Sequence, residues 1–474
     1  MQRNRELLSQ PYPVAPAYRN MTDTSRLSSQ RSNQGSDLTA RYQLHGVRER
    51  WVGPHSRVTA WGSALVIFGA LALEVQQPDI GIKLGNLIFM LACARVITLR
   101  CLLPPRTAAE VSSPSEYDLL IAFSLLWGAY SIVHSSSPED SFVHTVFAGA
   151  LWITILCVKS GRLDLTLRLI FWCGVAVASV ALTLGQLQVG WAFQPVSSNG
   201  EPELRGFFEH QLKLGMLTGI VLGIVFIAFC NKELKSLMGR CPPILFGAAV
   251  AIVLVAFYES HARSPLGALV ATLACCGSFA PRRAVRLATR AAVAAGIVVY
   301  WFHADEVSAM IFATESDLSF NGRTIIWEGT LEHAALNPWT GYGMASFGSP
   351  AFDSLWVHYR PLTAHNSYLQ AYFETGYVGL ALMVGLIAAL IVRGVYTSLL
   401  WRRLSYTLFV ALYGAFSSVM SVIYAGKPSM FLTLILLIAA QEAHATAQFR
   451  AASRGTQQSR FSRAAMAKPA AGTQ

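Results

Sequence analysis

Charged side chains are scarce in this sequence. Asp, Glu, Lys and Arg make up only 13% of the 474 residues, about half the share that is typical of soluble proteins. Apolar residues make up 53%, and the mean hydropathy is +0.42. The length alone would suit about two or three soluble domains, but this composition excludes that class and indicates an integral membrane protein.

The first 57 residues lack any apolar stretch of the length that a signal peptide needs. They are polar and rich in Ser, Gln and Arg, and a similar low-complexity segment rich in Ala, Arg, Gln and Ser occupies residues 445–474. We predict that residues 1–57 and 445–474 are disordered cytoplasmic tails that carry no chemistry.

Long apolar runs fill the sequence between these tails, and a helix needs about 20 such residues to cross a bilayer. Continuous runs of this length predict helices rather than the short alternating strands of a barrel. We therefore expect an all-α integral membrane protein with about twelve transmembrane helices. The predicted spans are residues 58–75, 80–99, 117–133, 142–158, 166–187, 212–230, 242–258, 264–280, 288–303, 367–393, 404–424 and 428–444. Nine spans thus fall in residues 58–303 and three in residues 367–444, on either side of one large loop at residues 304–366.

Basic residues are distributed unevenly around these spans. If the N-terminus is cytoplasmic, most of the 37 Lys and Arg fall in segments on the inner side, as the positive-inside rule requires. This asymmetry predicts that both termini are cytoplasmic and that the large loop is outside. The formal net charge of +11 is then mainly a topology signal, so a nucleic-acid partner loses its support.

A few cations oppose this rule and lie at or near the predicted outer face. A cation within a span is costly unless it has a partner or a water-filled cavity. These cations are Lys83, Arg205, Lys213, Arg263, Arg323, Arg360 and Lys427. They are candidates for binding an anionic ligand; the alternative is that each pairs with a local carboxylate such as Glu209, Glu259 or Glu374.

Cysteine is absent from the predicted outer loops, because all eight Cys fall in spans or on the inner side, and no CxxC pair occurs. Neither a disulfide framework nor a cysteine zinc site is expected. Histidine is placed the opposite way, and eight of the eleven lie in the outer half: His134, His144, His210, His261, His303, His333, His358 and His365. Groups able to transfer protons are therefore available on the outer side.

Two predicted outer segments, residues 188–211 and 304–366, are longer than a connection requires, and loops of that length are usually functional. In the second, residues 321–327 begin a predicted amphipathic helix at the membrane interface, which Pro338 would end. A turn with Gly341 and Gly343 follows. The loop ends at His365, at the mouth of a span.

These segments contain a set of short motifs in a fixed order. They are GRxxxW (Gly322, Arg323, Trp327), GYG (Gly341–Gly343), and HNSYLQ followed by ETG (His365–Gln370, Glu374–Gly376). Together they resemble the O-antigen ligase and polymerase superfamily. Arg205–His210 and Glu259–Ser264 resemble two further elements of that family, although Gln211-Leu212 stands where the family commonly has Pro-Asn or Lys-Asn.

The resemblance implies a fold of the GT-C type and a metal-independent, inverting glycosyltransferase without a cofactor. It also implies a location in the bacterial inner membrane, with the reaction at the periplasmic face. The implied donor is a glycan on undecaprenyl pyrophosphate and the implied acceptor is a sugar hydroxyl of another glycan. The lipid bilayer and a chain-length regulator are the other candidate partners.

The residues offer chemistry that suits such a reaction. Cleaving a glycosyl pyrophosphate develops negative charge, which needs either a divalent metal or fixed cations such as Arg, and the sequence has no clear acidic metal motif. We expect pyrophosphate or glycan to be bound by Arg205, Arg263, Arg323, Arg360, His210 and Glu209. His365 is the candidate catalytic base.

Structural alternatives remain for several of these residues. His365 could be a helix N-terminal residue bonded to Glu374 or to backbone, and His333 is an alternative base that more simply occupies a helix surface. Gly322, Gly341 and Gly343 are expected to be turn residues, and Trp327 an interfacial anchor.

Three functions remain open at this stage. The leading one is a polymerase that joins lipid-linked repeat units of an exopolysaccharide or O-antigen, and the alternative is a ligase that transfers glycan to lipid A core or protein. The third is a polysaccharide transporter, which is less favoured because the two halves of the sequence show no internal repeat.

Overall fold

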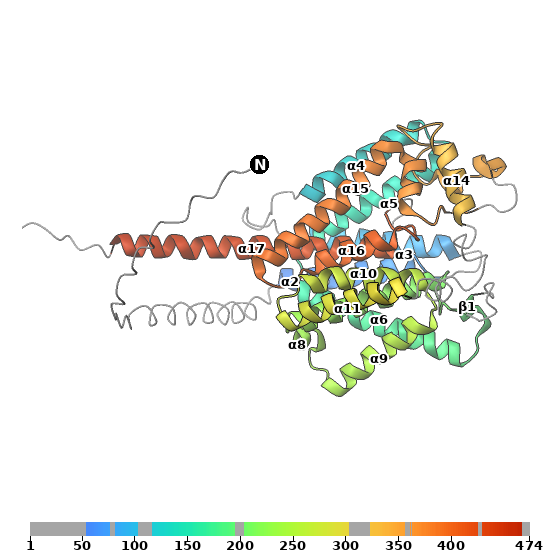
Figure 1. Cartoon of the computed structure of the whole chain (residues 1–474). Coiled ribbons are helices and arrows are strands. Elements are labelled where there is room, and N and C mark those ends of the chain that lie inside the picture. The colour runs from blue at the N-terminus through green and yellow to red at the C-terminus, as the bar shows by residue number, and fades with distance from the viewer. Residues whose placement is uncertain are drawn as a thin grey trace, which may run out of the picture. The chain divides into compact units, whose positions relative to one another are not determined.

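The computed structural model describes residues 54–75, 81–102, 116–194, 203–302, 323–355, 361, 363–424 and 429–466. The chain from His55 onward forms one compact unit. Figure 1 shows it as a bundle of long helices.

Each of the twelve predicted spans overlaps one helix, the shortest of which has 12 residues, and the all-α membrane class is confirmed. The first six of these helices are α2 (Pro54–Ala72), α3 (Gly81–Cys101), α4 (Glu116–Val133), α5 (Pro138–Val158), α6 (Leu163–Gln186) and α7 (Gln211–Cys230). The other six are α9 (Pro243–Glu259), α10 (Arg263–Ser278), α11 (Arg283–Phe302), α15 (Ser367–Trp401), α16 (Tyr406–Ser417) and α17 (Met430–Met466). By length and composition, 6 described helices could cross a membrane, and four further apolar helices are shorter.

Shorter elements connect these helices. They are α8 (Leu234–Met238), α14 (Arg323–Ala334), the 3-10 turns η2 (Gly190–Ala192), η3 (Ser346–Gly348) and η4 (Pro350–Leu355), and the strands β1 (Phe193–Gln194) and β2 (Glu203–Leu204). The strands pair antiparallel, with Phe193 opposite Leu204. The predicted helix of the large loop is therefore present as α14.

Two helix ends differ from the sequence prediction. The disordered tail was expected from residue 445, but α17 instead remains helical to Met466. Ala, Arg and Gln, which are frequent there, are good helix formers. In the same way α15 runs to Trp401, past the predicted end at residue 393. Apolar content therefore located the spans but not the polar continuations of their helices.

The helices pack as two groups that α16 and α17 connect. In one group α4 packs on α5 and α15, and in the other α7 packs on α6, α9 and α10. Helix α16 contacts α15, α10 and α7, while α17 contacts α5 and α6. Close approach of α16 to α7 depends on Gly223, where a Cβ atom would lie 1.7 Å from the Phe409 ring. Helix α14 and strand β1 lie at one end of the bundle, and the last turns of α17 project from the other (Figure 1).

Candidate functional site

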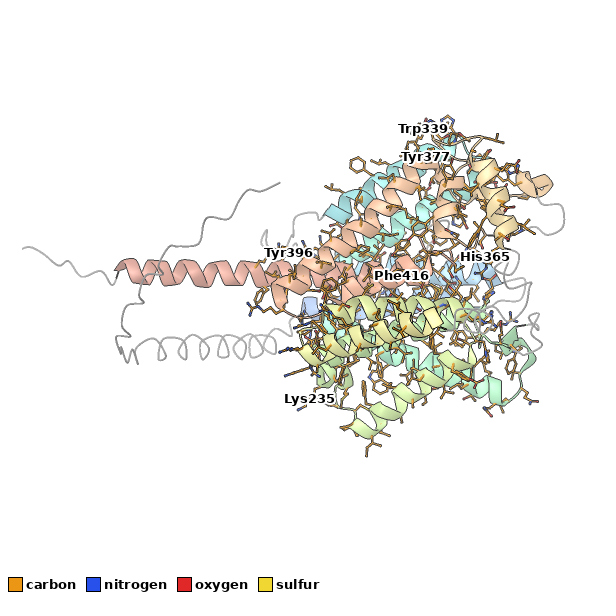
Figure 2. All side chains as sticks on the ribbon, in the orientation of Figure 1. Lys235, Trp339, His365, Tyr377, Tyr396 and Phe416 are labelled. Atoms are coloured by element: carbon orange, nitrogen blue, oxygen red, sulfur yellow. The ribbon has the colours of Figure 1, made fainter. Side chains whose placement is uncertain are left out.

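Five side chains from distant parts of the chain lie close enough to interact electrostatically at one end of the bundle. Burial and the charges of four residues lower the pKa of His210: His365, Arg323, Lys213 and Arg205. We call these five residues the histidine–arginine cluster. His365, just before α15, lies at the end of the bundle that carries α14 (Figure 2). Tyr396, near the other end of α15, lies far from it. The cluster therefore unites the Arg205–His210, GRxxxW and HNSYLQ segments.

Arg205 is held by backbone carbonyl groups. Its Nε donates to the carbonyl oxygen of Trp191 at 3.1 Å, and its Nη1 donates to that of Glu209 at 3.1 Å. Glu209 is exposed, and its backbone N–H donates to the carbonyl oxygen of Glu74 at 3.3 Å. The guanidinium is thus fixed without a carboxylate partner among the described residues.

His210 forms the N-terminal cap of α7. Its Nδ1 accepts a hydrogen bond from the backbone N–H of Leu212 at 3.1 Å, so in the neutral ring the proton resides on Nε2. Burial, and then the nearby His365, Arg323, Lys213 and Arg205, lower the pKa of His210 to about 3. At neutral pH the residue is therefore a neutral ring whose Nε2–H can donate a hydrogen bond.

Lys213 pairs with Glu74, at 2.8 Å between Nζ and Oε2. The other carboxylate oxygen of Glu74 accepts from the backbone N–H of Met430, the first residue of α17, at 3.1 Å. The expectation that an outer cation pairs with a carboxylate is correct for Lys213. Its partner, however, is Glu74, which the sequence analysis did not single out. An acid at the end of an apolar run, opposite a Lys within another run, was the available signal, because neither is stable alone in a membrane.

Arg323, the first residue of α14, is partly buried. Its Nη1 lies 3.4 Å from both the carbonyl oxygen and the sulfur of Met420. Burial lowers the pKa of the guanidinium, although Arg stays protonated in proteins. Among the described residues no carboxylate lies within ion-pair distance of Arg323. Its charge is therefore available to an anion.

His365 is in the left-handed conformation, with φ of 51°, which is uncommon for a residue other than glycine. Burial, and then the charge of Arg323, lower the pKa of its ring to about 4. The helix cap at this point is Asn366, whose side chain accepts from the backbone N–H groups of Tyr368 and Leu369 at 2.9 and 3.2 Å. Asn366, rather than His365, therefore caps α15.

The other predicted site residues are not members of the histidine–arginine cluster. Arg263 is exposed in the first turn of α10, which packs against α7. His333 lies on α14 with Nδ1 2.8 Å from the carbonyl oxygen of Gly329, as expected for a helix surface. Arg360 lies outside the described residues.

The GYG and ETG motifs bind each other through their backbones. The N–H groups of Tyr342 and Gly343 donate to the carbonyl oxygens of Phe373 and Glu374 at 3.0 and 2.8 Å. Gly376, with φ of 66°, interrupts α15 at this point. A Cβ atom on Gly376 would lie 2.3 Å from the carbonyl carbon of Trp339.

Gly341, in the GYG motif, likewise lies against the backbone of the ETG motif. It has φ of 65°, and a Cβ atom there would lie 2.5 Å from the carbonyl carbon of Glu374. The loop thus satisfies the carbonyl groups that the break in α15 exposes, as a broken helix in a membrane protein requires. Gly341 was expected to be a turn residue; in addition, Gly341 and Gly376 permit close contact between two backbone segments that are distant in the sequence.

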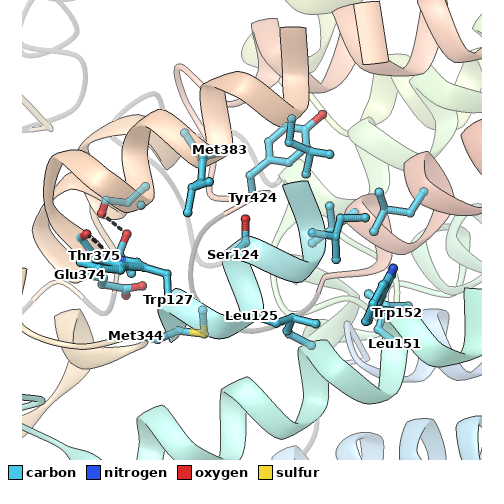
Figure 3. A pocket seen from close by; sticks show the side chains of 18 residues that line it. Ser124, Leu125, Trp127, Leu151, Trp152, Met344, Glu374, Thr375, Met383 and Tyr424 are labelled. Atoms are coloured by element: carbon cyan, nitrogen blue, oxygen red, sulfur yellow. Dashed lines mark hydrogen bonds between the residues drawn. The ribbon is translucent and has the colours of Figure 1, made fainter. Parts of the chain in front are cut away.

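An apolar cavity of about 130 Å³ lies beside this break, between α4, α5, α15 and α17. Its walls are mainly aliphatic and aromatic, with Ser124, Glu374 and Thr375 as polar members. Glu374 and Thr375 lie on the side of the cavity opposite Trp152 (Figure 3). The indole Nε1 of Trp127 donates to the carbonyl oxygen of Thr375 at 3.0 Å.

The donor set of the site suits an anion. Among the described residues, no group of three or more His, Cys, Asp or Glu side chains is placed to hold a metal ion. The cluster instead offers two guanidinium groups, one ammonium group and two imidazoles. Fixed cations of this kind match phosphate oxygens.

Comparison with known proteins gives two matches. Residues 248–384, from α9 into α15, match the family model described as O-antigen ligase. Over 286 residues the chain is 24% identical to the exopolysaccharide production protein ExoQ of Rhizobium meliloti (strain 1021), which covers 57% of this chain. The match spans 63% of that relative's length.

Proposed function

We propose that this chain is a polysaccharide polymerase of the O-antigen ligase and polymerase superfamily, to which the family model and the relative point. It joins oligosaccharide repeat units carried on undecaprenyl pyrophosphate at the periplasmic face of a bacterial inner membrane. The name of the relative supports a role in exopolysaccharide production, and the description of the family model keeps the ligase reaction as the second candidate.

The histidine–arginine cluster is the observation that carries this proposal. Arg323 has no described carboxylate partner, and Arg205 is bonded to carbonyl oxygens only. Cations placed in this way stabilise the charge that develops on a leaving diphosphate, and the planar guanidinium binds its oxygens with two parallel hydrogen bonds. We assign pyrophosphate binding to Arg205 and Arg323, with Arg263 and Arg360 as further candidates.

The two histidines have different roles in this mechanism. His210 donates from Nε2, because its Nδ1 is occupied by the N–H of Leu212. His365 accepts the proton of the acceptor hydroxyl as that oxygen attacks the anomeric carbon of the donor. The bond from the anomeric carbon to the phosphate oxygen breaks, undecaprenyl pyrophosphate leaves, and the configuration inverts.

The low pKa of His365 has a consequence for this step. With a pKa of about 4, the free imidazole is neutral at pH 7 but is a weak base. A bound diphosphate brings negative charge next to Arg323 and His365, which favours the protonated ring and raises its pKa. Donor binding therefore makes His365 a stronger base at the moment when it is needed.

The orientation of the protein follows from the same proposal. The histidine–arginine cluster faces the periplasm and both termini face the cytoplasm, as the basic residues predict. An alkaline phosphatase fusion after residue 340 should be active, and one after residue 285 should be inactive. The reverse pattern would place the cluster on the cytoplasmic side and overturn the proposed site.

Reconstitution tests the reaction itself. Purified protein in liposomes, supplied only with the lipid-linked repeat unit of its own strain, should yield longer lipid-linked glycans and free undecaprenyl pyrophosphate. Product that forms only after lipid A core is added would assign the ligase reaction, and transport without a new glycosidic bond would assign a transporter. Chelators should leave the rate unchanged; loss of activity that magnesium restores would contradict a mechanism based on fixed cations.

A further inference from the structure

Ala364, directly before His365, has both of its backbone polar groups bound by side chains. The Oε1 of Gln370 accepts from the N–H of Ala364 at 3.2 Å. The indole Nε1 of Trp327, from α14, donates to the carbonyl oxygen of Ala364 at 2.9 Å. Ala364 is fully buried, so these bonds have no competition from water. They fix the peptide planes on both sides of Ala364, the second of which enters His365.

The residues after His365 are equally fixed. Asn366 caps α15, and the N–H of Ser367 donates to the carbonyl oxygen of Ser418 at 2.8 Å. His365 is therefore held between two anchored neighbours in its left-handed conformation. Such sparsely populated conformations persist only where the surroundings determine them.

The orientation of the Gln370 amide depends on Glu374, one turn further along α15. The Nε2 of Gln370 donates to Oε1 of Glu374 at 2.9 Å, and both side chains are buried. An ionised carboxylate can only accept hydrogen bonds, so it selects the NH₂ end of the amide and leaves the oxygen facing Ala364. With the amide reversed, its NH₂ group would face the N–H of Ala364, and neither could be satisfied.

We propose that Glu374 and Gln370 are positioning residues that hold His365 in its reactive conformation. The proposal rests on the role of His365 as the base. A carboxylate in the wall of a largely apolar cavity is costly to bury, and an apolar residue would fill the same space. Its hydrogen bond to Gln370, and through it to Ala364, explains why an acid occupies this position.

Exchanging the two side chains provides the test. Gln370→Glu keeps an acceptor for Ala364 but places two carboxylates against each other, so the turnover number should fall at least tenfold. In the double variant Gln370→Glu/Glu374→Gln, the carboxylate at position 370 can accept from both the N–H of Ala364 and the amide at position 374. The double variant should therefore recover most of the lost turnover, with KM for the lipid-linked donor unchanged throughout.

Two further variants keep the test decisive if Gln370→Glu reduces folding. Glu374→Gln keeps an acceptor but no longer selects the orientation of the Gln370 amide, so it should lose part of the turnover, and Glu374→Leu, which offers no acceptor, should lose more. Ser398→Ala, a buried site on the same helix far from Ala364, is the control and should change neither turnover nor KM.

The outcomes separate this proposal from the proposed function. Wild-type turnover in Gln370→Glu, or equal loss in the single and double variants at equal thermal stability, would overturn the positioning role. Retained turnover in His365→Gln would instead overturn the assignment of the base, whatever the position 370 variants do.

Discussion

The two ends of the helix bundle differ in whether the chain itself supplies partners for all of its charged side chains. At the start of α16, carboxylates meet donors from the same chain; we call this site, formed by Glu233, Arg403, Ser405, Tyr406 and Glu442, the α16 junction. Arg403 pairs with Glu233 at 2.7 Å, and the hydroxyl of Tyr406 donates to the same carboxylate at 3.0 Å. In the histidine–arginine cluster, by contrast, Arg323 has no described carboxylate partner.

Glu442, a second carboxylate of the α16 junction, is also bonded by donors of the same chain. It is buried on α17, and it accepts from the hydroxyl of Ser405 at 2.5 Å and from the N–H of Thr407 at 2.8 Å. A carboxylate at the N-terminus of a helix is favoured by the helix dipole. Charge in a membrane protein must be compensated. At the α16 junction the chain supplies the partners, and in the cluster Glu74 does so for Lys213, whereas the charge of Arg323 is left to a ligand.

Glu442→Leu should give the largest effect on stability. It removes the partner of two backbone N–H groups and one hydroxyl, and leaving buried donors unsatisfied costs about 2–4 kcal/mol in all. The midpoint of thermal unfolding in detergent should fall, while turnover per folded molecule stays the same. Unchanged stability would show that the α16 junction does not stabilise the bundle.

Arg323→Gln should lower turnover and leave stability unchanged, the reverse of Glu442→Leu. We expect turnover to fall by about 10- to 100-fold, equivalent to about 1.4–2.7 kcal/mol, without loss of stability, because a partly buried cation without a carboxylate partner is removed. Arg403→Gln is the matched control and should lower the unfolding temperature but not turnover. If both variants behave alike, the distinction between the two ends fails.

The pH dependence should give the smallest effect. Burial and Arg323 hold the pKa of His365 at about 4, below its value in the unfolded chain, so the free enzyme loses its neutral base only as the pH falls through that value. The kcat/KM profile should therefore be flat above about pH 5. Because bound diphosphate raises the pKa, the acid limb of kcat should lie at higher pH than that of kcat/KM. A kcat/KM limb near the ordinary histidine value would contradict the burial of this ring.

Local patterns in the sequence predicted much of this architecture. Apolar runs located the long helices, and the amphipathic pattern after Arg323 located α14. The motif order predicted a resemblance to the O-antigen ligase and polymerase superfamily, and the match of residues 248–384 to the O-antigen ligase family model agrees with it. Helix positions and short motifs depend on residues that are close together in the chain, so they can be recognised from a single sequence.

Contacts between distant segments could not be predicted in the same way. Glu374 was considered as a partner for a cation or for His365, yet it accepts from Gln370. Likewise Gly341, which looked like an ordinary turn residue, lies against the backbone of Glu374, and Gly376 lies against the backbone of Trp339. The sequence contains these residues but not the distances between them, which depend on how α14 and the following loop fold back on α15.

The turnover of His365→Gln in liposomes tests the central claim most directly, because Gln keeps a hydrogen-bonding side chain but cannot accept the proton. General-base assistance is worth about 10²- to 10⁴-fold in rate, so we predict a loss in that range, with donor binding and thermal stability unchanged. His365→Ala should be equally inactive. Near-normal turnover in His365→Gln would contradict the account and would move the search for the base to His333, His210 or Glu209.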